Sequence, residues 1–189
     1  MTAVHELHRM AVAAHELPTP RLNRPDDIEY HTHTSSAVVF PEKRNVHGKA
    51  FGGFVASGAF DLAYFAAQFF TRGALFVPIG LDDADFLQPV SIGDMVRFVA
   101  RVVHCGDDAV FRVLVTMDVI EPTDPGKLPQ RTNRLMFAFA TDPTNKRTVL
   151  PKSYPEVLMH VDAARRHATQ GLGPNAVEDL ATFFGKAPA

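Results

Sequence analysis

"FGGFVASGAFDLAYFAAQFF", residues 51–70, is an apolar stretch that begins beside two glycines and carries one carboxylate, Asp61. Its length and its apolar residues on nearly every side predict a buried helix from about Phe54 to Phe70. Glycine weakens a helix, and a carboxylate among apolar side chains must be solvated or used. We therefore expect this stretch both to decide the fold and to hold functional residues.

Strand patterns lie on both sides of this predicted helix. "TSSAVVF" (34–40) precedes it, and four strand-like segments follow it: 77–86, 95–104, 109–120 and 132–141. In 109–120, apolar residues alternate with Arg112, Thr116 and Asp118, which predicts a sheet with one wet face. A strand, a long helix and four strands predict an α+β fold in which a curved antiparallel sheet wraps around one central helix, the hotdog arrangement.

Composition limits the classes of partner. The net charge of −2, from 19 basic and 21 acidic residues, gives no overall attraction to nucleic acid or to an anionic membrane. No apolar run is long enough to span a bilayer, and Cys105 as the only cysteine excludes an internal disulfide. The first residues lack the pattern of a targeting peptide. These features give no reason to expect nucleic acid or a membrane as partner, and the single cysteine fits a reducing compartment, either the cytoplasm or the mitochondrial matrix.

Three parts are expected along the chain. Residues 1–33 are interpreted as an N-terminal helical extension and residues 34–167 as the hotdog domain. Residues 168–189 form a C-terminal tail in which "NAVEDLATFFGK" is a short helix.

The central helix carries a polar stripe at spacings of four, three and four, which consists of Ser57, Asp61, Tyr64 and Gln68. Such a stripe is typical of the solvent face of an amphipathic helix, or it marks a site. Gly52 and Gly53 favour a site, because N–H groups at a bare helix start can stabilise a developing negative charge. We expect Asp61 to be buried near these donors.

The segments "NVHGKAFGGF", "FDLA", "LDDADFLQPVSIGD" and "VLPKSYPE" resemble the hotdog-fold acyl-CoA thioesterases, nearest to the mitochondrial branch with two hotdog domains in tandem. The resemblance covers about residues 34–167. It implies hydrolysis of acyl-CoA to free fatty acid and coenzyme A. Only one copy of the motif is present, so the resemblance implies that a second chain completes the site, in a homodimer or a trimer of dimers.

The resemblance also implies roles for single residues. Asp61 would act as general base, or alternatively as nucleophile; Asn45 would hold the water or the carbonyl; and the Gly53 N–H would receive the oxyanion. This chemistry needs no metal and no cofactor beyond the coenzyme A of the substrate.

Coenzyme A also requires cations for its phosphates and a lining for its thioester end. The candidate residues are Gly52, Phe54, Arg131, Arg147 and Lys152, with Arg134 and Lys146 as further cations. The histidines suggest a metal only weakly, at His31 and His33 or at His5 and His8, and no metal site is expected.

Two other functions stay open. A hotdog enoyl-CoA hydratase or dehydratase would use His47 as base with Asp61 as its partner, although such chemistry does not need Asn45. A non-catalytic acyl-CoA-binding subunit would need only the pocket.

Overall fold

The chain is described here by a computed structural model that covers residues 27–124, 126–145, 147–169 and 182. The helices proposed from sequence for the N-terminal extension and for residues 175–186 lie outside these residues, apart from Thr182. Among the described residues, no helix is both long enough and apolar enough to cross a membrane.

One five-stranded antiparallel sheet forms the frame of the molecule, with the strand order β1-β3-β4-β5-β2. Its strands are β1 (Thr32–Val38), β2 (Phe76–Phe86), β3 (Met95–Cys105), β4 (Val110–Ile120) and β5 (Gln130–Thr141). Three short 3-10 helices, η1 (Glu29–His31), η2 (Pro41–Lys43) and η3 (Pro143–Asn145), lie in the connections. All five strands match the segments predicted from sequence periodicity.

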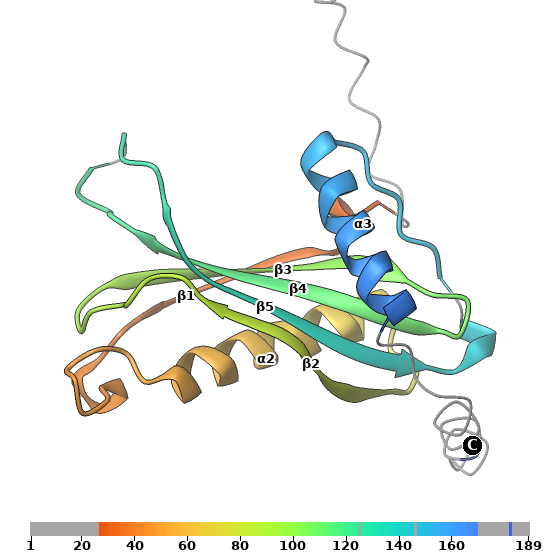
Figure 1. Cartoon of the computed structure of the whole chain (residues 1–189), viewed down its shortest axis with the longest axis horizontal. Helices are drawn as coiled ribbons and strands as arrows, with labels where there is room; N and C mark the ends of the chain where they lie inside the picture. Colours follow the sequence, from red (N-terminus) through yellow and green to blue (C-terminus); the bar gives the residue numbers. More distant parts are fainter. Residues whose placement is uncertain (1–26, 125, 146, 170–181, 183–189) are drawn as a thin grey trace, which may run out of the picture.

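Helix α2 (Gly52–Phe70) lies along one face of the sheet, as Figure 1 shows. Four fully buried alanines let the helix approach the strands closely: Ala59, Ala63, Ala66 and Ala67. They pack in one core with Phe111, Val113, Val115 and Met117, the apolar face predicted for β4. The predicted hotdog arrangement is therefore confirmed.

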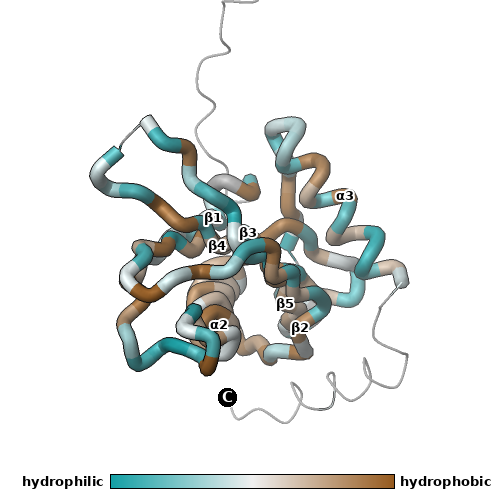
Figure 2. The backbone as a smooth tube through the Cα atoms, turned by 60° about the vertical axis from the view of Figure 1, so that its left-hand side comes forward, coloured by the Kyte–Doolittle hydropathy of each residue, from teal (hydrophilic) through white to brown (hydrophobic). Residues whose placement is uncertain are grey.

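The opposite face of the sheet differs from the prediction of a wet surface. Arg112, Thr116 and Asp118 on β4 are all buried, with Arg112 only 2% exposed. A second helix, α3 (Tyr154–Thr169), crosses this face (Figures 1 and 2). Hydrogen bonds and ion pairs engage the side chains of these three β4 residues, so alternation of residue type identified the two faces correctly but not their solvation.

Candidate functional site

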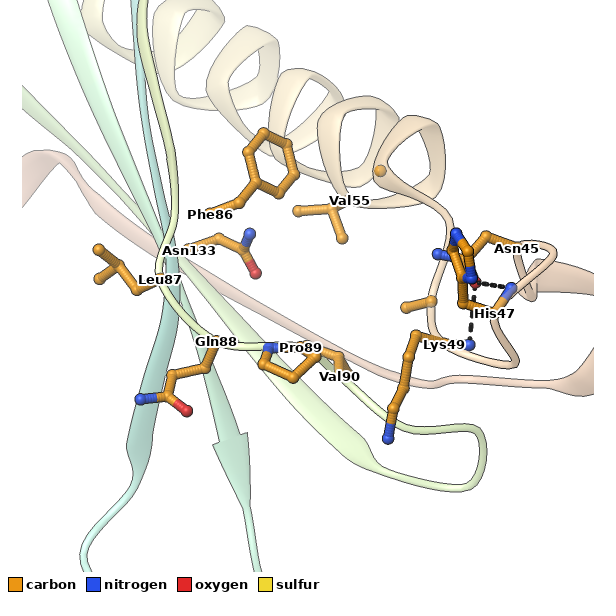
Figure 3. A pocket seen from close by; sticks show the side chains of 12 residues that line it. Asn45, His47, Lys49, Val55, Phe86, Leu87, Gln88, Pro89, Val90 and Asn133 are labelled. Atoms are coloured by element: carbon orange, nitrogen blue, oxygen red, sulfur yellow. Dashed lines mark hydrogen bonds between the residues drawn. The ribbon is translucent and has the colours of Figure 1, made fainter.

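The loop before α2 holds Asn45 in a defined orientation. Its side-chain Oδ1 accepts hydrogen bonds from the backbone N–H groups of His47 (2.9 Å) and Lys49 (3.1 Å), drawn as dashed lines in Figure 3. Its own N–H donates to the Lys49 carbonyl at 2.7 Å, and Gly48 takes a φ of 72° to close the turn. The side-chain Nδ2 has no partner among the described residues, so it can donate to a water or a carbonyl oxygen.

The N-terminus of α2 offers further donors. Phe51 is the N-cap and provides no side-chain cap, while its N–H donates to the Lys43 carbonyl at 2.7 Å. The N–H groups of Gly52 and Gly53 have no partner within the described chain. Free N–H groups at the positive end of a helix dipole suit an oxyanion, as the sequence predicted.

The ring of Phe51 covers Gly53. A Cβ atom built on Gly53 would lie 2.2 Å from Cε1 of Phe51, whereas one on Gly52 would meet the Phe86 ring at an ordinary 3.6 Å. A side chain at position 53 would therefore have to displace the Phe51 ring, which is exposed and free to move.

Two pockets lie on either side of the start of α2. The first, which we call the loop pocket, measures about 370 Å³ and is lined among others by Asn45, Gly52, Val55, Phe86 and Asn133. Figure 3 shows Asn45 and Asn133 on opposite walls of it. The second, the helix pocket, measures about 590 Å³ and includes Gly53, Phe54, Ser57, Gly58 and Asp61.

A single chain does not bring Asn45 and Asp61 together. Asn45 lines the loop pocket beside Gly52, and Asp61 lines the helix pocket. Nine residues at about 100° each place Asp61 on the far side of the helix from Gly52 and roughly 13 Å further along its axis. One copy therefore presents two half-sites.

The expectation that Asp61 is buried is wrong for the single chain. All four residues of the polar stripe are exposed, and the neighbouring Phe65 and Phe69 are 48% and 55% exposed. The four side chains do share one helix face, as predicted, but this face is turned away from the chain's own sheet. Beside it, burial lowers the pKa of His33, whose ring packs against Phe65 and Phe69.

The candidate coenzyme A residues are dispersed. Arg131 is ion-paired with Asp118, Lys152 Nζ lies 2.5 Å from Asp27, and Arg134 lies 2.6 Å from Asp162. The guanidinium of Arg147 stacks over Phe70, the last residue of α2, while Gly52 and Phe54 belong to its first turn. Lys146 lies outside the described residues. Arg131 and Arg134 line one pocket under α3, but the described candidates do not all converge on one position within a chain.

Sequence reasoning missed several residues that the structure places at the half-sites. Lys49 and Asn133 line the loop pocket, and Lys43 and Arg44 line the helix pocket. The run "EKR" directly before Asn45 was the available signal for two of these cations. Asn133 is 2% exposed, and its buried Oδ1 has no hydrogen-bond partner in the part of the chain that the structure describes. Its sequence context gave no signal.

No metal cluster stands out in the described part of the chain, where no three histidine, cysteine or acidic side chains are grouped to hold an ion. His31 and His33 are described, whereas His5 and His8 are not.

Comparison with known proteins supports the resemblance read from the sequence. The chain is 31% identical over 118 residues to acyl-coenzyme A thioesterase 2, chloroplastic, of Humulus lupulus, an alignment that covers 60% of this chain and 26% of that protein. It is 29% identical over 140 residues to human acyl-coenzyme A thioesterase 9, mitochondrial. That alignment covers 74% of this chain and 30% of that protein. The chain thus spans less than a third of these relatives, and no family model matches it.

A solved structure shares the fold. The acyl-CoA hydrolase of Staphylococcus aureus, in complex with butyryl coenzyme A, coenzyme A and coenzyme A disulfide, superposes with a TM-score of 0.67 at 22% identity. The match covers 83% of this chain and 95% of that one. The predicted resemblance to hotdog-fold acyl-CoA thioesterases is confirmed in sequence similarity and in fold.

Proposed function

We propose that the chain hydrolyses acyl-CoA thioesters to free fatty acid and coenzyme A, at a site completed by two copies of the chain. The observation that carries this proposal is the arrangement at the start of α2. Nδ2 of Asn45 and the unpaired N–H groups of Gly52 and Gly53 lie around the N-terminus of α2, and Asp61 lies on the same helix.

In the proposed reaction, Asp61 of one copy removes a proton from a water molecule as that water attacks the thioester carbonyl carbon. The Gly53 N–H stabilises the oxyanion that forms. Nδ2 of Asn45 from the other copy holds the water or the carbonyl oxygen. Collapse of the tetrahedral intermediate breaks the carbon–sulfur bond, and the departing thiolate takes up a proton as coenzyme A.

The exposed face of α2 supports a second copy. Tyr64, Phe65 and Phe69 are large aromatic side chains left uncovered beside Asp61. The edge strand β2 also exposes apolar residues, including Leu81 and Phe86. Exposed apolar patches and open strand edges are typical of surfaces covered by a partner, and a closed homodimer covers both copies equally.

The activity is tested by incubating the purified chain with acyl-CoA thioesters of increasing chain length while free thiol is measured. Enoyl-CoA hydration is followed separately by loss of the conjugated double bond. We expect thiol release and no hydration. Hydration without thiol release would favour the hydratase alternative, and saturable binding without either reaction would favour an acyl-CoA-binding subunit.

A further inference from the structure

A third pocket lies between α3 and the sheet face that α3 crosses, on the opposite face of the sheet from α2 and both half-sites. This back-face pocket measures about 620 Å³, a size typical of small-molecule sites. Its walls combine charged groups with apolar side chains: Leu114 comes from β4, and Leu158 and Met159 come from α3.

Almost every charge at this pocket is already neutralised by a partner. Arg134 donates to Asp162 at 2.6 Å. Although burial raises the pKa of Asp162, hydrogen bonds from Arg134, Arg165 and Arg166 lower it to about 2, so this carboxylate is fully engaged.

The other two charges of the lining are engaged in the same way. Arg131 pairs with the buried Asp118, which Arg97 also approaches. The carboxylate of Glu156 accepts the backbone N–H groups of Lys152 and Ser153 at the start of α3.

Arg101 is the exception. It projects from β3 beside Leu114, with which it pairs across the strands, and it is half-buried. Its guanidinium makes no hydrogen bond or ion pair with any described residue. Burial, and after it the like charge of Arg131, lowers the pKa of Arg101, while the more weakly acting carboxylates of Glu156 and Asp118 raise it. A half-buried guanidinium with five unused donors is costly unless an anion joins it.

We propose that the back-face pocket binds a small aliphatic monocarboxylate, whose carboxylate pairs with Arg101 and whose chain lies against Leu114, Leu158 and Met159. One uncompensated cation matches one negative charge, and a planar guanidinium matches a carboxylate with two parallel hydrogen bonds. A phosphate dianion would leave an excess negative charge beside Asp162 and Glu156. The apolar wall selects an anion with a hydrocarbon chain over an inorganic one.

The test measures octanoate binding to the full chain by titration calorimetry. We expect saturable binding that weakens about ten-fold or more in Arg101→Gln, in line with the loss of a charge-assisted pair. Arg165→Gln is the matched control, because this arginine also lies near Asp162 but its side chain is 75% exposed; its octanoate affinity should equal that of the wild type.

Three comparisons make the outcome decisive. Octanol should not bind at Arg101, and inorganic phosphate should bind far more weakly than octanoate. Asp61→Asn should keep the Arg101-dependent binding, which separates this pocket from a product site at α2 and from the proposed function. Absence of octanoate binding, equal loss in both arginine variants, or Arg101-dependent binding of phosphate or coenzyme A without octanoate would overturn the proposal.

Discussion

Asn45 has two separable tasks, because its two side-chain polar atoms have different surroundings. Oδ1 closes the 45–49 turn, while Nδ2 is free to reach a substrate or water. Asn45→Ala removes both atoms, and Asn45→Asp keeps the acceptor that closes the turn but replaces the donor with a carboxylate oxygen.

We therefore predict that Asn45→Asp loses thiol-releasing turnover by about two to four orders of magnitude with a nearly unchanged melting temperature. Asn45→Ala should lose as much activity and some stability as well. Thiol release and thermal unfolding on the same preparations check this. An active Asn45→Asp enzyme would show that the residue serves only the turn.

Gly53 lies under the Phe51 ring, and this contact allows its role to be tested. Gly53→Ala must displace that ring, which is exposed and can move at little cost to stability. If the Gly53 N–H receives the oxyanion, the disturbance should cost about 2 to 4 kcal/mol of transition-state stabilisation while the melting temperature changes little. Gly126→Ala is the control, since a Cβ there meets its nearest atom at an ordinary 3.5 Å.

Measured thiol release should fall in Gly53→Ala and stay at the wild-type rate in Gly126→Ala. If Gly53→Ala instead lowers the melting temperature and leaves the rate per folded molecule intact, the glycine serves packing and the oxyanion role is wrong.

At the scale of single residues, sequence reasoning identified groups whose chemistry is local. Gly53 and Asp61 were singled out because the helix start and the helical stripe are sequence-local patterns, whereas Asn45 was proposed from the resemblance to the thioesterases. Asn133 could not be found, because it enters the loop pocket from β5, far along the chain from Asn45. The positions of the candidate cations could not be predicted for the same reason. The sequence does not show which acidic side chain will pair with a given basic residue.

At the scale of elements, the helix and the five strands followed from the periods of their apolar residues. Helix α3 was missed because its apolar residues form no clear buried stripe: Tyr154, Val157, Leu158 and Val161 are exposed, and Ala163 is its one residue described as buried. Its attachment to the sheet depends largely on ion pairs, such as Arg166 with Asp83 at 2.8 Å. Met159 and Ala163, four residues apart, were the faint apolar signal of its packed side.

A histidine cluster lies where α3 packs against the sheet. His104 on β3 contacts the rings of His160 and His167 of α3, and neither of its ring nitrogens has a hydrogen-bond partner among the described residues. Burial, with the neighbouring His167, His160 and Arg112, lowers the pKa of His104 from 6.5 to about 4, while Asp108 acts in the opposite sense.

Because the unfolded chain takes up this proton near pH 6.5 and the folded chain only near pH 4, the unfolded state holds more protons in that window. The free energy of unfolding should therefore decrease as the pH falls from about 6.5 to 4. His104→Phe, which keeps a ring and loses no hydrogen bond, should flatten this dependence. Melting temperatures at pH 7 and pH 5 check it, and an equal drop in the wild type and the variant would rule out His104 as a source.

At the scale of the whole molecule, the arrangement of α2 requires a partner for the proposed chemistry. Each copy presents Asn45 in one pocket and Asp61 in another, on opposite sides of one helix. The aromatic residues exposed beside Asp61 provide a surface for the second copy. In a symmetric dimer, each of two sites would take Asn45 from one chain and Asp61 from the other.

Mixing two inactive variants tests this central claim most directly. Asn45→Asp and Asp61→Asn, each expected to be nearly inactive alone, are unfolded together, refolded as a mixture and assayed for thiol release. In a mixed dimer, the intact Asn45 of one chain meets the intact Asp61 of the other, so one of its two sites is restored. Random pairing makes half of the dimers mixed, and the account predicts recovery of about a quarter of wild-type activity. Activity no greater than the sum of the separate variants would contradict a site shared between two chains.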